Sequence, residues 1–197
     1  MKIAAVVMLW LLLVAGGMVS LEAYKSAAGA QVPAPADWPA ASRLPRVAGL
    51  KTLVMMSHPK CPCTRASLAE LETLLSQYRE RLTVYVLFVQ PKDVSHEWTK
   101  TDLWQAASRI NGVHALVDDN STEADRFKGL TSGQVVLYDA EGRLEFTGGI
   151  TGARGHVGDN LGLKRLLAIL RGEETDRSDS PVFGCPLHAE QEARRGE

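Results

Sequence analysis

The sequence predicts an α/β domain behind one apolar N-terminal helix, and three observations support this prediction. Short apolar runs at 51–57 and 83–89 have the length and β-branched content of strands that are buried on both faces. Between them, leucines from Leu68 to Leu82 recur at helical spacing. Later in the chain, two further apolar runs flank a turn that ends at Gly142, which is typical of a β-hairpin.

The elements follow one another as β-α-β, then α-β-α, then β-β-α. Because the first unit joins two strands through a helix, we expect a right-handed crossover. Ser121 is placed to cap a small helix, and Asn160 to cap the last one. In chain order we expect strands at 51–57, 83–89, 113–117, 134–138 and 143–147. We expect longer helices whose apolar positions run over 68–82 and 98–110, and a final helix at 160–171.

The N-terminal run from Ile3 to Leu21 contains no charged residue. At about 1.5 Å per residue, such a helix is close to the ~30 Å of a bilayer core. With only Lys2 before it, the charge pattern agrees with an N-terminus inside the cell. We interpret residues 1–23 as a single-pass anchor in the inner (cytoplasmic) membrane, with the domain on the periplasmic or extracellular side. The competing interpretation is a signal peptide cleaved after the small residues 28–30.

The rest of the chain divides by composition. Residues 24–46 hold four prolines among alanines, which favours an extended spacer. Residues 47–172 have the size of one ordinary domain, and residues 173–197 form a charged tail that carries Cys185. The formal net charge is −1, so no basic surface indicates a nucleic-acid partner.

Two of the three cysteines, Cys61 and Cys63, stand where the first strand gives way to the first domain helix. The N–H groups and dipole of a helix start favour thiolate over thiol. We therefore predict Cys61 as a partly exposed nucleophile, with Pro62 at the first helical position. Lys60 and Arg65 are placed to add a modest stabilisation of the thiolate.

Cys185 lies in an apolar island, residues 181–187, within the charged tail. Such an island suggests that the tail folds back onto the domain. If it reaches the strand–helix junction, Cys185 is a resolving thiol or a third metal ligand; otherwise its role is local. An odd number of cysteines in an oxidising compartment leaves one thiol free, shuttling or bound.

The cysteine motif after the first strand and the closing β-β-α resemble the thioredoxin-like fold, particularly its membrane-tethered TlpA-type branch. The segments 58–66 and 148–156 are similar to bacterial RedB-type proteins. The resemblance implies a central mixed sheet flanked by helices and a disulfide-linked reaction at Cys61. It also implies that the loop before the last helix brings His156 near Cys61, while His58 is close to it in sequence.

The chain departs from the thioredoxin pattern at two places. Thioredoxins have Cys-x-x-Cys, whereas Cys61 and Cys63 are two steps apart, a turn of about 200° on a helix. A disulfide between them needs Cys61 outside regular helix. At the position of the family's cis-proline the chain has residues 130–133 without a proline, and Thr131 and Ser132 offer hydroxyls there instead.

The leading hypothesis is a thiol–disulfide oxidoreductase with Cys61, Cys63 and Cys185 as its catalytic residues. It requires no organic cofactor, and its partners are protein thiols or disulfides in the cell envelope. The alternative is a copper chaperone, in which two thiolates with His156 or Cys185 hold Cu(I). A third hypothesis is a peroxidase that uses Cys61 with Thr131 or Arg154.

Overall fold

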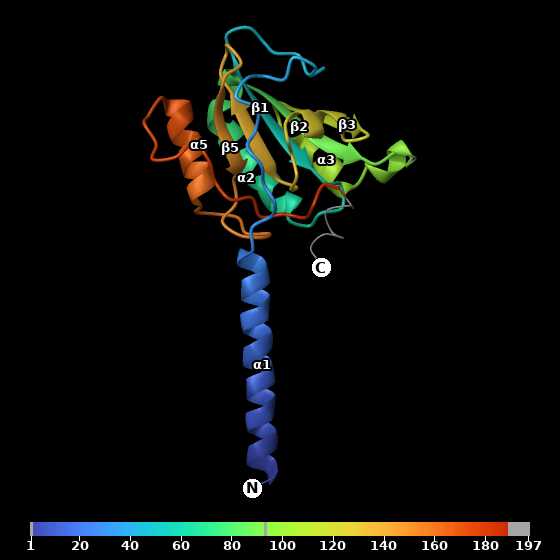
Figure 1. The fold of residues 1–197 in the computed structure, drawn as a ribbon, viewed down its shortest axis with the longest axis vertical. Helices are drawn as coiled ribbons and strands as arrows, with labels where there is room; N and C mark the ends of the chain where they lie inside the picture. Colours follow the sequence, from blue (N-terminus) through green and yellow to red (C-terminus); the bar gives the residue numbers. More distant parts are fainter. Residues whose placement is uncertain (1, 93, 189–197) are drawn as a thin grey trace.

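Five strands form one mixed sheet in the order β3-β2-β1-β4-β5 (Figure 1). The structure is a computed structural model that describes residues 2–92 and 94–188. β1 pairs in parallel with β2 and antiparallel with β4, while β3 extends the parallel side and β5 the antiparallel side. The strands are β1 (Lys51–Ser57), β2 (Leu82–Gln90), β3 (Val113–Asp119), β4 (Gln134–Tyr138) and β5 (Leu144–Gly149). The predicted mixed sheet is confirmed.

Helices connect the strands where the apolar spacing predicted them. The side chain of Asn160 accepts the N–H of Leu163 at 2.7 Å and caps the last helix, as expected. The helices are α1 (Lys2–Ser26), α2 (Thr64–Tyr78), α3 (Asp102–Arg109), α4 (Thr122–Arg126) and α5 (Leu161–Arg171), with 3-10 turns η1 (Arg79–Arg81) and η2 (His96–Trp98).

The predicted cap of α4 is wrong. Ser121 precedes this helix, but its side chain makes no capping hydrogen bond and its backbone is left-handed, with φ 54°. The carboxylate of Asp118 accepts the N–H groups of Glu123 and Ala124 instead, each at 2.8 Å. One carboxylate satisfies two unpaired donors and interacts favourably with the helix dipole, so it replaces the hydroxyl.

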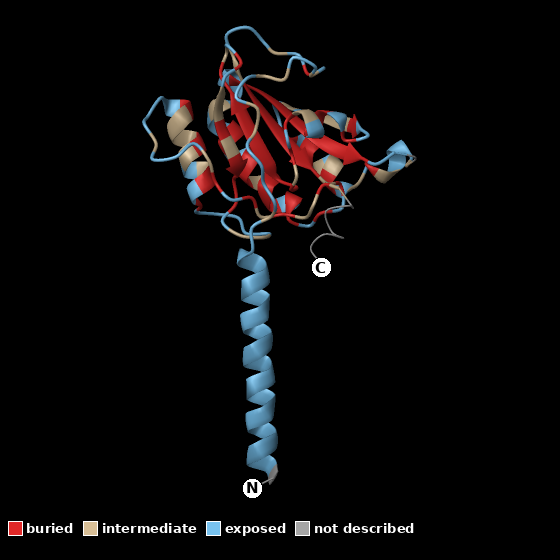
Figure 2. Ribbon diagram, in the orientation of Figure 1, coloured by how far each residue is buried: buried red, intermediate tan, exposed pale blue. Residues whose placement is uncertain are grey.

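Each face of the sheet has its own apolar layer, because successive strand residues point to opposite faces. Leu53 and Met55 of β1 pack on the face that α2, α3 and α5 cover. Val54 and Met56 pack on the other face. Figure 2 shows the sheet buried between these layers. Both methionines are therefore core residues, as the strand pattern predicted.

The second face is covered by α4, by the segment before β1 and by the end of the chain. The Trp38 ring meets Phe127 and Tyr138 edge-on, at centroid distances of 5.0 and 5.3 Å. The Tyr138 hydroxyl donates to the carbonyl of Pro35 at 2.9 Å. Near the other end of the chain, Leu187 joins the same cluster. The proline-rich segment thus lies along the domain, where its aromatic side chain contributes to the core.

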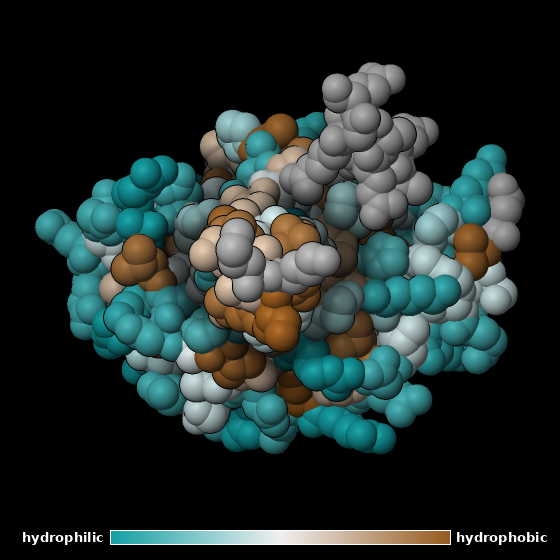
Figure 3. All heavy atoms as spheres, turned by 90° about the horizontal axis from the view of Figure 1, so that it is seen from below, coloured by the Kyte–Doolittle hydropathy of each residue, from teal (hydrophilic) through white to brown (hydrophobic). Residues whose placement is uncertain are grey.

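α1 projects from the lower end of the domain in Figure 1, and its residues are exposed (Figure 2). The span Ile3–Ser26, with mean hydropathy 2.4, is long and apolar enough to cross a membrane, and a signal sequence passes the same test. Seen from below in Figure 3, its apolar side chains stand against a largely hydrophilic domain surface. At its domain end, the carbonyl of Lys25 accepts the N–H of Arg154 at 3.0 Å.

Candidate functional site

The first two cysteines lie in a tight turn between β1 and α2. The N–H of Cys61 donates to the carbonyl of His58, and the N–H of Thr64 donates to the carbonyl of Cys61, both at 3.1 Å. α2 begins at Thr64 with Cys63 as its N-cap residue. The predicted strand–helix junction is confirmed. Pro62 is not at the first helical position, however, because the turn extends two residues further than expected.

The third cysteine reaches this turn from the C-terminal segment, residues 181–188. Figure 1 shows this segment in red as it crosses the lower end of the domain. The Sγ atom of Cys185 lies 2.9 Å from that of Cys61, and the Cys185 N–H donates to the Cys61 sulfur at 3.4 Å. All three cysteines are free thiols. The structure thus brings together two sulfurs that are 124 positions apart.

The three thiols differ in pKa because they share hydrogen bonds. Hydrogen bonds from the thiols of Cys185 and Cys63 hold the pKa of Cys61 far below its usual value, against the opposing effect of burial. The hydrogen bond to Cys61 raises the pKa of Cys185 far above its usual value. For Cys63, the hydrogen bond to Cys185 lowers the pKa, but the bond to Cys61 and burial outweigh it. Among the three thiols, these interactions therefore favour ionisation of Cys61 over ionisation of Cys63 or Cys185.

The expected exposure of the nucleophile is wrong. Cys61 is 1% exposed and Cys63 is 8% exposed, whereas Cys185 is partly exposed. The C-terminal segment lies over the turn and buries its own Val182 and Leu187. The local sequence around Cys61 and Cys63 does not predict their burial, because the residues that cover them come from the far end of the chain.

The basic residues beside the cysteines are engaged elsewhere. The Lys60 ammonium lies over the ring of Trp98, 4.8 Å from its centroid. Arg65 forms an ion pair with Asp102 on α3. The thiolate is therefore stabilised by hydrogen bonds and not by these two cations.

Arg154, from the loop after β5, contacts the site instead. Its guanidinium donates to the carbonyl of Gly184 at 2.5 Å and lies 4.9 Å from the ring of Tyr24 at the end of α1. From the sequence pattern Arg154 had only a peroxidase role, and Gly184 was not singled out. An arginine in a glycine-rich loop and a glycine before Cys-Pro are weak sequence signals for a functional site. Only the fold brings Arg154 and Gly184 into contact.

The hydroxyl of Ser132 ties the loop before β4 to the cysteine turn. Its Oγ accepts the N–H of His58 at 2.8 Å and lies 2.8 Å from Thr64 Oγ1. Both hydroxyl side chains are fully buried, so their partners must come from the protein, and Thr64 Oγ1 also lies 3.5 Å from the carbonyl oxygen of His58, to which it donates. Of the two hydroxyls expected in place of a cis-proline, that of Ser132 therefore lies at the cysteine turn, whereas Thr131 Oγ1 donates to the carbonyl of Ala30 at 2.8 Å. Within the described residues no peptide bond is cis.

The backbone of the same loop pairs with the C-terminal segment. The N–H of Ser132 donates to the carbonyl of Cys185 at 2.8 Å, and the N–H of Leu187 donates to the carbonyl of Leu130 at 3.0 Å. Between these two hydrogen bonds, Thr131 and Pro186 form an isolated antiparallel bridge. The C-terminal segment therefore lies in this loop like a short added strand, with its cysteine over Cys61.

The two histidines have different surroundings. Nδ1 of His58 accepts the N–H of Lys60 at 3.1 Å, and its ring meets Trp98 edge-on at 5.4 Å. His156 is exposed, and its N–H donates to the carbonyl of Ala153 at 3.2 Å. The loop that the resemblance placed near the cysteines is there, but Arg154 is the side chain that it brings to the site.

Two further features bear on ligands. Among residues 2–92 and 94–188, no group of three or more His, Cys, Asp or Glu side chains is arranged to hold a metal ion.

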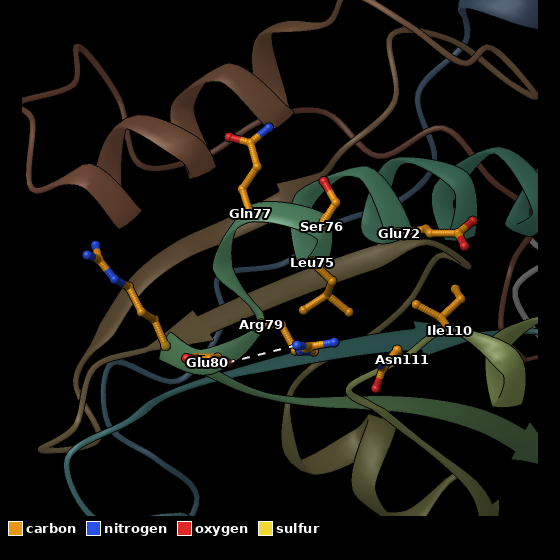
Figure 4. Close-up of a pocket in the computed structure, with 9 residues that line it drawn as sticks. Glu72, Leu75, Ser76, Gln77, Arg79, Glu80, Ile110 and Asn111 are labelled. Atoms are coloured by element: carbon orange, nitrogen blue, oxygen red, sulfur yellow. Dashed lines mark ion pairs between the residues drawn. The ribbon is translucent and has the colours of Figure 1, made fainter.

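A surface hollow of about 510 Å³ lies around the C-terminal end of α2 and η1, and Figure 4 shows the exposed Arg79–Glu80 pair on its wall. The cysteines are at the opposite end of α2, so this hollow is separate from their site.

No protein-family model matches the sequence, and no curated protein matches it. Among solved structures, a hypothetical protein from Sinorhizobium meliloti is 21% identical over 71% of this chain and 79% of its own, with a TM-score of 0.58. An uncharacterized conserved protein from Geobacillus kaustophilus is 17% identical over 82% of this chain and 92% of its own, with a TM-score of 0.57. A secreted disulfide oxidoreductase from Mycobacterium tuberculosis is 13% identical over 64% and 83%, with a TM-score of 0.44.

The chain shares its fold with the first two of these proteins, and the order and directions of its five strands are those of the thioredoxin-like fold. The mixed five-stranded sheet, the flanking helices and the cysteine turn after β1 all agree with it. At these identities the likeness concerns the fold, so the argument for an activity rests on the three sulfurs and their surroundings.

Proposed function

We propose that the chain is a membrane-tethered, extracytoplasmic thiol–disulfide oxidoreductase in which Cys61 and Cys185 form the redox couple. The 2.9 Å separation of their Sγ atoms carries the proposal. A disulfide bond is about 2.05 Å long, so a small movement closes it. Cys63 hydrogen-bonds to Cys61 and serves as a donor that stabilises the thiolate.

The reaction moves two electrons between this couple and a partner pair of thiols. In one direction a partner dithiol becomes a disulfide while the Cys61–Cys185 disulfide becomes a Cys61 thiolate and a Cys185 thiol, and one proton is released to solvent; the other direction is the reverse. No cofactor enters this balance. The partners are thiol or disulfide proteins of the cell envelope, in keeping with the resemblance to TlpA-type and RedB-type proteins.

The geometry favours Cys185 over Cys63 as the partner of Cys61 in the disulfide. Cys63 is the N-cap of α2 and is held by the first turn of that helix, where the N–H of Ala66 donates to its carbonyl at 3.1 Å. The Sγ atom of Cys185, by contrast, already lies 2.9 Å from that of Cys61, and the Cys185 N–H donates to the same sulfur.

Tethering by α1 is part of the proposal. The helix has the length and hydropathy of a membrane span, and its last turn contacts the loop that carries Arg154. Arg154 in turn holds the C-terminal segment through Gly184. An anchored chain therefore keeps the three sulfurs at the membrane-facing end of the domain, within reach of partners that present thiols near the membrane surface.

A redox titration of the full-length chain in detergent tests the activity. The protein is equilibrated in glutathione buffers of increasing oxidation, quenched, and its free thiols are counted and mapped by mass spectrometry. We expect two thiols to disappear together into a Cys61–Cys185 disulfide. Cys63→Ser keeps the couple, and Cys61→Ser abolishes it. Tight stoichiometric binding of Cu(I) without any such couple would replace the proposal with a copper carrier.

The tether needs its own test. We expect the mature protein to retain residues 1–30 by mass spectrometry and to stay with membranes during alkaline extraction. A mature N-terminus after Ala30 together with extraction into the soluble fraction would contradict it and would leave the redox couple unaffected.

A further inference from the structure

The three sulfurs of the site are unequally accessible. Cys61 is 1% exposed and Cys63 8%, while Cys185 is the one that reaches the surface in part. Exchange between a thiolate and a disulfide requires direct access to the sulfur that is attacked. A partner protein that approaches the closed site therefore meets Cys185 first.

The C-terminal segment, residues 181–188, forms the cover over Cys61 and is held in place at several points. Its backbone pairs with residues 130–132, its carbonyl at Gly184 accepts from Arg154, and Leu187 is 4% exposed in the apolar layer behind the sheet. Gly184 fits closely, because a Cβ atom there would lie 1.9 Å from the carbonyl oxygen of Ser132. Direct attack on Cys61 requires this segment to leave, whereas attack on Cys185 does not.

We propose, on the basis of the redox couple described above, that partner proteins exchange at Cys185 and that Cys61 acts behind it as the internal thiol. A partner thiolate attacks the Cys185 sulfur of the Cys61–Cys185 disulfide. The partner–Cys185 bond forms, the Cys61–Cys185 bond breaks, and Cys61 leaves as a thiolate. The partner's second thiolate then attacks the partner sulfur that is bonded to Cys185. This step forms the partner's disulfide and releases Cys185, which takes up a proton.

The hydrogen bonds support this order of events. A thiol with a low pKa leaves faster in disulfide exchange. In the reduced site, hydrogen bonds from the Cys185 thiol, the Cys63 thiol and the Cys185 N–H lower the pKa of Cys61. The last two of these donors do not require the Cys185 sulfur to be a free thiol. The raised pKa of Cys185 depends chiefly on its hydrogen bond to Cys61, which is absent when Cys61 is bound to a partner, so access is the argument that decides between the two sulfurs.

Glutathione serves as the probe thiol for the test. Full-length Cys63→Ser protein in detergent is oxidised, exposed briefly to glutathione, quenched with acid and treated with maleimide, and the cysteines are mapped by mass spectrometry. We expect glutathione on Cys185 and maleimide on Cys61, with at least a tenfold excess over the reverse arrangement.

The outcomes separate this inference from the proposed function. If the starting disulfide between Cys61 and Cys185 does not form, the redox couple itself fails and the inference fails with it. If the disulfide forms but glutathione lands on Cys61, or on both sulfurs to a similar extent, the couple stands and the entry through Cys185 is overturned.

A second measurement tests the cover directly. In reduced Cys63→Ser/Cys185→Ser protein, Cys61 is the remaining thiol and its maleimide labelling reports access. We expect Arg154→Gln, which removes the contact to Gly184, to speed labelling about tenfold. Arg171→Gln removes an exposed pair with Glu173 and is expected to leave the rate unchanged. Labelling of Cys61 as fast as a peptide thiolate, before Arg154 is changed, would show that no cover exists.

Discussion

The N–H of Ser132 donates to the carbonyl of Cys185 at 2.8 Å. This one backbone hydrogen bond joins the loop before β4 to the C-terminal segment and positions Cys185 over the cysteine turn. A net contribution of about 0.5–1.5 kcal/mol is typical for such a bond. Its larger effect is geometric, because it holds the backbone of Cys185 against the loop beside the cysteine turn.

Replacing Gly184 is expected to open the site. In Gly184→Ala the new Cβ would fall 1.9 Å from the Ser132 carbonyl oxygen, so the C-terminal segment must move away from the loop. We expect the equilibrium constant for the Cys61–Cys185 disulfide in glutathione buffer to fall at least tenfold, which corresponds to about 1.4 kcal/mol. Thiol mapping of the oxidised variant measures this.

Gly152→Ala is the matched control for this prediction. It lies in the loop after β5, where a Cβ atom would meet its nearest neighbours at 3.4–3.6 Å, an ordinary contact. Its disulfide equilibrium should equal that of the parent chain. A Gly184→Ala protein that behaves the same way would mean that the segment is not fixed by its contact with Ser132.

Removal of the Ser132 hydroxyl is expected to destabilise the domain. Ser132→Ala takes away the acceptor of the His58 N–H and the partner of the Thr64 hydroxyl, at a site that is 1% exposed. Leaving buried polar groups without partners costs about 1–3 kcal/mol. Urea unfolding should show this loss, whereas Ser108→Ala, an exposed serine on α3, should change stability by less than about 0.5 kcal/mol.

The strands were predictable because each is defined by its own residues. β1 and β4 are predicted to the residue, and β2 and β3 within a few positions, since their apolar runs are bounded by turns. The role of the segment before β1 was not predictable in the same way. Its proline and alanine content describes a spacer, and only the sheet shows that Trp38 packs against Phe127.

The site was predictable only in part, for a related reason. Cys61 and Cys63 are recognisable from their local pattern, and the apolar island around Cys185 suggested that the tail folds back. The burial of Cys61 and the contact of Arg154 with Gly184 depend on long-range packing of segments that lack a period of their own. Local sequence patterns therefore identified the cysteines, but they did not predict that the C-terminal segment limits access to Cys61.

Cys63 is expected to control the acidity of Cys61. Its thiol donates a hydrogen bond that lowers the pKa of Cys61, second in effect to that of Cys185. Cys63→Ala removes this donor, whereas Cys63→Ser keeps one. We expect the pKa of Cys61, followed by thiolate absorbance in the ultraviolet, to be higher in the alanine variant than in the serine variant. Equal values would show that Cys63 has no such role.

The stability of the reduced protein should depend on pH in both directions around 9.0, the ordinary value for these thiols. The hydrogen bonds from Cys185 and Cys63 lower the pKa of Cys61 in the folded state, so between that lowered value and 9.0 the unfolded chain binds more protons and stability rises with pH. Above 9.0 the sign reverses, because the raised pKa values of Cys63 and Cys185 keep protons on the folded chain that the unfolded chain has lost.

The oxidised protein supplies the control for this pH dependence, because the Cys61–Cys185 disulfide removes the thiols of Cys61 and Cys185 and leaves only Cys63 to titrate. One proton changes the free energy of unfolding by about 1.4 kcal/mol per pH unit. Urea unfolding from neutral pH to beyond 9.0 should therefore show a rise and then a fall in the stability of the reduced form relative to the oxidised form. Parallel curves for the two forms would mean that Cys61 is an ordinary protonated thiol, and the redox couple would lose its electrostatic basis.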